Sequence, residues 1–449
     1  MQVVPAEQSV DSVTLEPSPE TWGSLAENFA RPDSAARFRQ QLGLPTDGLI
    51  VMGGHQAQFW HPGVLAKVFA VAAAARSLGA TPAWLVVDHD TNAPDQIRYP
   101  VRIDSLAATT WWAAPRVDSL TTGSRPAITP TAPSVEHTQP FVADGLRQMR
   151  SALAKHTGGS LSDQLTSAAM DLIGESEMRI VRSSDLARTD LFSHVLADPA
   201  ALADSYNRAV ASVKNGSDIR PLTVDDRGRE LPLWHISADG TRSPVYGSQL
   251  SSIDPSALAP RALLMTGLIR LAGCDLFVHG TGGGNETGYD RITEAWLSEL
   301  LGAALAPSVV ATATARLPLD ADAPSEEQID RAKWLAHNAK HNPALLDDRQ
   351  AADAKTDILA RAERAKADKQ NPAPIFAELQ GLLADYRDRH ADRLAQLLAD
   401  ANRLEARREE SAVAHDRTWP FPLYPPTMID QLREQVGRGF GDPTIARAT

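Results

Sequence analysis

Short apolar runs alternate with polar segments in the first part of the chain. Residues 49–52 and 84–87 have the length of buried strands, and residues 64–78 between them are apolar, Ala-rich and helical in character. Polar residues follow each run directly. The pattern predicts a βαβ unit over residues 48–90, with polar residues at the carboxyl ends of two parallel strands. Open α/β sheets bind ligands at that edge.

A similar pattern returns later in the chain. Residues 275–279 predict a strand, a Gly-rich segment follows, and a helical pattern then runs through Leu301. Between the two units the sequence predicts a strand at 179–182 and a hairpin that turns at Asp239-Gly240. Helical patterns cover residues 142–153, 161–173, 200–213 and 261–271. We therefore predict an α/β fold with a parallel sheet core that spans residues 46–318, carries inserted segments at about 91–178, and follows a lead-in at 1–45.

The chain changes character after residue 324. Ser325 and Gln328 have the spacing of a helix capping box, and the residues that follow are rich in Ala, Lys, Asp and Arg. Pro372 and Pro374 break the pattern, and a second long helix follows. Two long helices joined by a Pro turn predict an antiparallel coiled-coil arm at 325–410, with charged faces that are solvated. Such an arm is often a dimerisation element, so we expect a homodimer. Residues 411–449 are expected to pack on the core.

The composition narrows the function classes. The chain has 449 residues, 43% of them apolar and 22% charged, and a formal net charge of −12. It has no cluster of basic residues, which argues against a nucleic-acid partner. A single cysteine, Cys274, excludes an internal disulfide framework and fits a reducing compartment. Because the N-terminus has no signal-peptide pattern and no run has the length of a membrane span, we expect a soluble, cytoplasmic protein.

The first polar segment follows residues 49–52 and contains Gly53, Gly54, His55, Gln56 and His61. Paired glycines before a helix let backbone N–H groups approach a phosphate or a carboxylate. The two histidines could be metal ligands, acid–base groups or donors to an anion. Alternatively, one imidazole caps a helix or bonds a backbone carbonyl, and His61 also suits a helix start. Lys67, two turns into the helix, is expected on the surface.

The second polar segment is Asp88-His89-Asp90. Successive residues of a strand alternate faces, so the two carboxylates are expected to converge while His89 points elsewhere, unless a turn intervenes. Two carboxylates can hold Mg²⁺, position a ribose or orient a base. The alternative is a loop that satisfies its own backbone through Asx turns.

The third segment is the Gly-rich stretch at residues 280–288. Its glycines favour close approach of the backbone to a ligand at a helix start, although a flexible turn is the alternative. It is neither a Walker A loop nor the dinucleotide fingerprint. Glu286 and Tyr289 are one helical turn apart and could face the same pocket.

Together these segments are similar to those of a known family. Gly54-His55-Gln56-Ala57, Asp88-His89-Asp90, and the stretch from Gly280 to Glu286 with Tyr289 resemble, in order, the motifs of the bacillithiol-synthesis enzymes of the BshC type. The segment around Pro260-Arg261 and the strand near residues 307–310 also resemble that family. The chain is thus similar to a divergent member over about residues 48–410. The resemblance implies a Rossmann-like core with insertions, a coiled-coil arm, and an amide-forming ligase that adds cysteine to a glucosaminyl-malate-like acceptor.

We therefore expect a carbon–nitrogen ligase that joins the amino group of cysteine, or of another amino acid, to a sugar-acid carboxylate. Our chemical assignments make His55 or His89 the proton acceptor, let Asp88 and Asp90 position a ribose, metal or ammonium group, and let Arg261 clamp a carboxylate. ATP or ADP is possible, and no metal is predicted. Alternatives are a metal-dependent hydrolase that uses the His/Asp cluster, or a non-enzymatic dimeric scaffold. The remaining candidate binding residues are Gly53, Gly54, Gln56, His61, His279, Thr281, Gly282, Gly283, Asn285, Glu286 and Tyr289.

Overall fold

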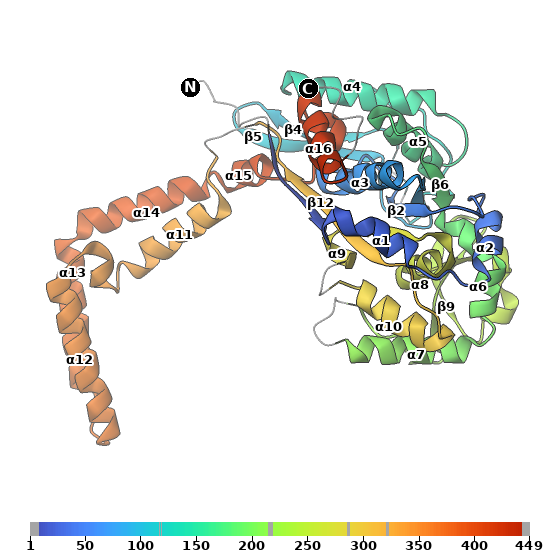
Figure 1. Ribbon diagram of the computed structural model, residues 1–449. Coiled ribbons are helices and arrows are strands. Elements are labelled where there is room, and N and C mark those ends of the chain that lie inside the picture. The colour runs from blue at the N-terminus through green and yellow to red at the C-terminus, as the bar shows by residue number, and fades with distance from the viewer. Residues whose placement is uncertain are drawn as a thin grey trace. The chain divides into compact units, whose positions relative to one another are not determined.

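The computed structural model describes residues 9–115, 117, 119–213, 219–284, 288–319 and 323–441 (Figure 1). These residues form two compact units. One comprises residues 102–107 and 318–416, and the other comprises the rest of the described chain. The predicted arm, residues 325–410, lies within the first unit. The polar segments and the strands predicted around them lie within the second unit.

A six-stranded sheet is the centre of the second unit. Its strand order is β1-β12-β11-β2-β3-β6. All neighbours are parallel except β1 and β12, which are antiparallel. The strands are β1 (Val10–Glu16), β2 (Ile50–Gln56), β3 (Thr81–Val87), β6 (Arg179–Arg182), β11 (Leu276–His279) and β12 (Ser308–Ala315). The direction of strand succession reverses between β2 and β11, and a crevice at the carboxyl ends of such strands is where ligands bind in open α/β sheets.

The predicted βαβ unit is confirmed as β2, α3 (Pro62–Leu78) and β3. His61 begins α3, because its ring Nδ1 accepts a hydrogen bond from the N–H of Gly63 at 3.1 Å. Gly79 ends the helix in the left-handed conformation, with a φ of 60°. Residues 62–75 of α3 are buried, as expected for a helix between a sheet and a second layer.

Helices cover both faces of this sheet. Alternate residues of β2 face opposite layers, so Ile50 and Met52 join the core formed with α2, α7, α8 and α10, whereas Gly53 faces α3. Helix α16 packs against α3, where the Arg433 guanidinium lies 4.5 Å from the centre of the Phe69 ring. The helices of the unit are α1 (Trp22–Glu27), α2 (Ala35–Gln41), α4 (Pro140–Lys155), α5 (Leu161–Ile173), α6 (Asp190–Val195), α7 (Pro199–Ser212), α8 (Ala262–Leu268), α9 (Thr281–Gly284), α10 (Asp290–Leu301) and α16 (Pro426–Arg438).

Two smaller sheets accompany the main one. The predicted hairpin is confirmed as β8 (Gly228–Ile236) paired with β9 (Arg242–Tyr246), and β8 also pairs with β7 (Val224–Asp225) and β10 (Leu258–Pro260). Strands β4 (Gln96–Arg102) and β5 (Leu106–Trp112) form a two-stranded sheet within the predicted insertion. Cys274 is buried, and burial raises the pKa of its thiol.

The ends of the chain are more structured than predicted. The lead-in contributes β1, which covers the edge of β12, and the tail contributes α16. Helix α16 begins at Pro426, because a proline in the first turn of a helix loses no hydrogen bond. Within the second unit, the Phe421 N–H donates to the Trp60 carbonyl at 2.7 Å, whereas residues 411–416 of the predicted tail belong to the first unit.

The first unit is helical and contains α11 (Glu326–Asn338), α12 (Arg349–Ala367), α13 (Ala373–Arg389), α14 (Ala391–Glu405) and α15 (Arg408–Ala414). The capping box of Ser325 and Gln328 is confirmed at the start of α11. Each predicted long helix is divided into two. Pro343 interrupts the first at a 3₁₀ turn, and the second is interrupted at His390, whose Nε2 lies 3.0 Å from Asp348 at the start of α12. Helix α11 packs on α14, and α12 packs on α13.

Among the described residues, no helix combines the length and the apolar character needed to cross a membrane.

Candidate functional site

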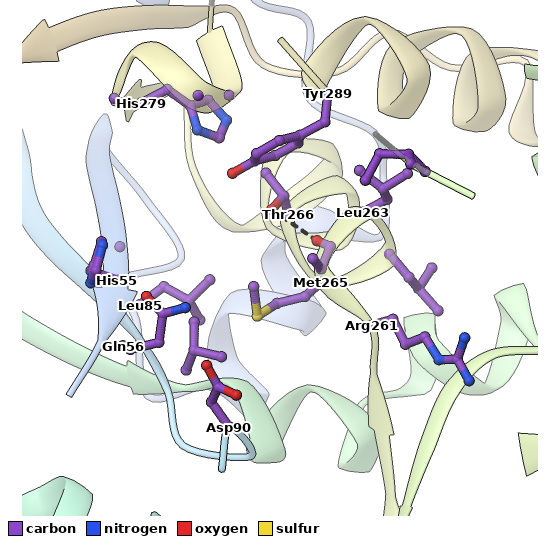
Figure 2. Close-up of a pocket in the computed structure, with 18 of the residues that line it drawn as sticks. His55, Gln56, Leu85, Asp90, Arg261, Leu263, Met265, Thr266, His279 and Tyr289 are labelled. Carbon is purple, nitrogen blue, oxygen red and sulfur yellow. Dashed lines mark hydrogen bonds between the residues drawn. The ribbon is translucent and has the colours of Figure 1, made fainter. Parts of the chain in front are cut away.

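A cleft of about 710 Å³ opens at the carboxyl ends of β2, β3 and β11. Figure 2 shows His55 and Gln56 on one side of it, Arg261 opposite them, and His279 and Tyr289 at the far end from Asp90. The three sequence segments singled out above therefore meet around one cavity. The candidate residues that line it are Gly54, His55, Gln56, His61, His89, Asp90, Arg261, His279, Thr281, Gly282, Gly283 and Tyr289.

Four candidate residues are not in this lining. Gly53 lies below the cleft in β2, and Asp88 is buried behind it. Asn285 and Glu286 lie outside the described residues, so the expectation that Glu286 and Tyr289 face one pocket stays a prediction for Glu286.

The paired glycines are strand residues rather than a loop before a helix, which corrects their predicted role. Gly53 and Gly54 pair in register with Trp84 and Leu85 of β3. A Cβ at Gly53 would lie 2.9 Å from the Trp84 ring, and one at Gly54 would lie 2.8 Å from both the Cβ and the carbonyl oxygen of Leu85. The absence of side chains lets β3 and α3 pack closely on β2. Sheet pairing and packing thus account for both glycines.

Lys67 was expected on the surface, and that prediction was wrong. Its side chain is 6% exposed and lines the cleft. The ammonium group donates to the Gly54 carbonyl at 2.7 Å and lies 5.5 Å from the centre of the Trp84 ring. Burial lowers the pKa of Lys67 to about 8. The sequence signal was present, since Lys67 lies on the otherwise apolar face of a fully buried helix.

Asp88, His89 and Asp90 separate because β3 ends at Val87 and a turn follows, so the predicted convergence of the two carboxylates does not occur. Asp88 Oδ1 accepts from the Ser183 hydroxyl at 2.7 Å and the Ser184 N–H at 2.9 Å, and its Oδ2 accepts from the Ser184 hydroxyl at 2.5 Å. These bonds satisfy the carboxylate away from the cleft, which indicates a structural role.

The other two residues of this segment face the cleft. His89 is 4% exposed, and its Nδ1 lies 2.6 Å from the Ser183 hydroxyl, which donates its own hydrogen to Asp88. His89 Nδ1 is therefore the protonated nitrogen. Burial lowers the pKa of His89 to about 4. Asp90 accepts from the Arg242 guanidinium at 3.2 Å and retains partial exposure.

His55, near the end of β2, is half-buried. Burial, together with the nearby charge of Lys67, lowers the pKa of His55 to about 3. Its Nδ1 has no hydrogen-bond partner among the described residues. A low pKa keeps both His55 and His89 neutral at pH 7 but makes each a weak proton acceptor.

An arginine–tryptophan stack forms another wall. The Arg261 and Arg242 guanidinium groups lie 4.1 and 4.4 Å from the centre of the Trp234 ring. Arg261 Nη1 also donates to Glu230 at 2.7 Å, and Arg220 bonds the same carboxylate through two nitrogens. These bonds hold the pKa of Glu230 well below its usual range, against the opposing effect of burial. Arg261 thus clamps a carboxylate of the protein itself, where a substrate carboxylate was expected.

At the end of β11, His279 meets a buried acid that sequence reasoning missed. His279 Nε2 lies 3.0 Å from Asp290 Oδ2, and Arg270 Nη1 lies 2.8 Å from the same oxygen. Neither contact has the geometry of a hydrogen bond, although both are within ion-pair distance. Burial opposes ionisation of Asp290, but its contacts with His279, Arg270 and Ser308 lower its pKa to about 2. Asp290 is the first residue of α10, where an acidic side chain favours the helix. A helix start therefore explains this residue in the sequence without any role in a site.

The Gly-rich segment packs against this histidine. A Cβ at Gly283 would lie 2.5 Å from His279 Nδ1, and a Cβ at Gly284 would lie 2.9 Å from His279 Cβ. These two glycines therefore allow α9 to cover the imidazole. Thr281 and Gly282 are exposed at the mouth of the cleft. Tyr289 packs edge-on against the same ring, and burial raises its pKa to about 12.

The described lining is cationic, although the chain as a whole is acidic. It contains four basic side chains, Lys67, Arg220, Arg242 and Arg261, and one carboxylate, Asp90. Arg220 and Arg242 were not singled out from the sequence, and Lys67 was expected on the surface, since these residues are distant from one another in the chain. A cleft of this sign attracts anionic ligands.

In the described part of the chain, no group of three or more His, Cys, Asp or Glu side chains is arranged to hold a metal ion. The predicted His/Asp cluster is dispersed because Asp88 turns toward Ser183 and Ser184. A scan against protein-family models finds no match for this chain, and a search of curated proteins finds no significant match either.

Proposed function

We propose that the protein is a carbon–nitrogen ligase that joins the amino group of an amino acid to a carboxylate of an acidic acceptor. The observation that carries the proposal is the basic cleft, which contains four cationic side chains and lies at the carboxyl ends of parallel strands in an acidic chain. The strand order, with its reversal between β2 and β11, supports a Rossmann-like core. The family resemblance of the motifs supports cysteine as the amine and a glucosaminyl-malate-like compound as the acceptor.

The basic wall of the cleft suits the acceptor. Arg242 and Lys67 would attract its carboxylate, while Asp90, the one acidic side chain of the described lining, would attract the ammonium group of the amino acid. Arg261 is held by Glu230 and so presents a fixed guanidinium rather than a mobile one. Because Asp90 contacts Arg242, this arrangement would hold the carboxylate and the ammonium group close to each other.

Amide formation requires an activated carboxylate. We propose an acyl phosphate, for which a nucleoside triphosphate is the chemical source. The amine nitrogen forms the C–N bond, phosphate departs with the electrons of the C–O bond, and the nitrogen loses a proton. We assign that proton to His279 rather than to His55 or His89. The pKa values of about 3 and about 4 make those two imidazoles poor acceptors, whereas Asp290 stabilises the imidazolium of His279.

We also propose that the paired helices of the first unit form the coiled-coil arm and join two copies of the chain. Trp334 on α11 and Leu398 on α14 support this proposal, since they are 55% and 43% exposed although both are large and apolar. The charged side chains of the arm then flank an apolar contact.

Incubation of the purified protein with ATP, cysteine and glucosaminyl-malate tests the ligase proposal. We expect mass spectrometry to detect the condensed amide and phosphate to be released in equal amount. Omission of each substrate in turn is the control. Absence of the amide with cysteine and with a panel of other amino acids, together with no thermal shift by any of these compounds, would refute the proposal.

A further inference from the structure

The Lys67 ammonium group is buried without an acidic partner. Its Nζ has one hydrogen bond, to the Gly54 carbonyl, and lies over the Trp84 ring. Within the described residues, no Asp or Glu oxygen forms an ion pair with it. By contrast, the other basic residues of the lining, Arg220, Arg242 and Arg261, each contact a carboxylate. A buried charge is costly unless it is paired, so an anion bound in the cleft would stabilise this ammonium group.

The position of Lys67 indicates where such a partner would lie. Lys67 projects from α3, and its Cδ passes 3.8 Å from where a Cβ of Gly280 would be, directly after β11. Its Nζ reaches the end of β2 at Gly54. The ammonium group therefore lies at the carboxyl ends of β2 and β11, between which the strand succession reverses. This is the position at which open α/β sheets bind ligands.

We propose that Lys67 is the counter-ion of an oxyanion of the ligand, a carboxylate or a phosphate, bound where β2 and β11 diverge. An ammonium group has three N–H donors, and among the described residues one of them is used. The remaining two would bind the oxyanion. The inference rests on the proposed function in one respect, because it assigns a position to the anionic group of the acceptor or of the activated intermediate. Lys67 thus takes the anion-binding role that was predicted for the paired glycines, which are strand residues.

Anion binding at this position has a measurable proton signature. Burial lowers the pKa of Lys67 to about 8, and a bound anion would raise it again, so binding near pH 8 takes up a proton. The other titratable groups of the surrounding elements are His55 on β2, His61 at the start of α3, and His279 on β11. The pKa of His55 is about 3, which keeps it neutral at this pH. Loss of the proton uptake on replacement of Lys67 would assign the proton to its ammonium group.

The experiment is isothermal titration of the full chain at pH 8 with inorganic phosphate and, separately, with malate. Each titration is run in HEPES and in Tris, which differ in ionisation enthalpy. We expect saturable binding of at least one probe with uptake of about half a proton per site. Lys67→Met should weaken that binding about tenfold or more and abolish the uptake, whereas Lys67→Arg should retain binding without uptake. Preference for phosphate over malate, or the reverse, identifies the kind of oxyanion.

Lys155→Met is the matched control. Lys155 carries the same side chain but is exposed and contacts Asp171, so neither the affinity nor the uptake should change. Thermal unfolding verifies that Lys67→Met folds, and removal of an unpaired buried charge should leave the melting temperature unchanged or raise it. Failure of the wild-type chain to bind either anion, or unchanged affinity and uptake in Lys67→Met, would overturn the inference. Uptake without amide synthesis would support this anion site and contradict only the ligase. Amide synthesis that is unimpaired in Lys67→Met would support the ligase and contradict the anion site at Lys67.

Discussion

At the scale of single residues, the contact between His279 and Asp290 supports the proposal that His279 accepts the proton. Asp290 is 3% exposed and also contacts Arg270, so its charge is fixed on the side of the imidazole that faces away from α9. A carboxylate in this position sets the tautomer of the ring and stabilises its protonated form. The histidine was predicted from the sequence, but its acid was not, because eleven positions and a Gly-rich segment separate them.

We therefore expect Asp290→Asn to lower the rate of amide formation about 100-fold with little effect on substrate affinity. The same substitution should change the tautomer ratio of His279 in nitrogen NMR spectra, which a purely structural role would not require. Asp171→Asn is the control, because it removes a carboxylate 2.8 Å from Nε2 of His156, away from the cleft. An unchanged pH–rate profile in Asp290→Asn would contradict the assignment.

The lowered pKa values of His55 and His89 predict the response of the fold to acid. The pKa values of His55 and His89 are about 3 and about 4 in the folded chain, below the ordinary value of about 6.5. The unfolded chain therefore binds more protons between these values, and the free energy of unfolding falls as the pH drops below about 6.5. We expect a loss of about 1 to 2 kcal/mol per histidine between pH 7 and pH 5.

Urea unfolding at a series of pH values measures this slope. Replacement of both histidines by Gln should flatten it, whereas His194→Gln, at an exposed position, should not. A slope that survives the double replacement would show that other groups cause the acid sensitivity.

At the scale of elements, β2 shows what a periodicity argument can and cannot provide. Its apolar half, residues 50–52, was predicted as a strand, whereas Gly53 to Gln56 were assigned to a loop because they are polar or lack side chains. The strand continues through them because β3 supplies parallel partners up to Val87. Tertiary pairing thus overrides local propensity at the point where the cleft begins. The same limit applies to β1, whose strand character depends on β12, about 300 residues away in the chain.

Gly54→Ala tests how closely β2 and β3 pack. Its Cβ would lie 2.8 Å from the Leu85 carbonyl oxygen, a backbone atom that cannot rotate away. We expect a loss of about 2 to 4 kcal/mol in the free energy of unfolding, measured with denaturant. Gly282→Ala is the matched control at the rim of the same cleft, since nothing lies within 4 Å of its Cβ. Equal stability of the two variants would contradict the close packing described here.

The helical unit shows a second limit. The positions of its breaks at Pro343 and His390 follow from a missing N–H in one case and from contacts of Asp348 with His390 and Arg389 in the other. The first is visible in the sequence. The break at His390 depends on which helices pack together, and the local sequence does not indicate this.

At the scale of the whole molecule, the proposed homodimer makes the exposed apolar side chains of the arm testable. Sedimentation analysis of the wild-type chain should give the mass of two chains. Combined Trp334→Glu and Leu398→Glu substitutions should give the mass of one, because they place charge in an apolar contact. Ile103→Glu is the control, as Ile103 is also exposed but lies outside the helices. A monomeric wild-type chain would remove the dimer proposal and leave the cleft unaffected.

The position of β11 has a consequence for synthesis of the chain. Residues 276–279 insert beside β2, which was made more than 200 residues earlier, and β12 and β1 then extend the sheet outward. Until that insertion, a nascent chain holds β2 as an open hydrogen-bonding edge, and only half of the cavity wall exists. Ribosome-bound intermediates of this protein should therefore depend on chaperones for most of translation, and shortened versions that stop before residue 276 should aggregate rather than retain partial ligand binding.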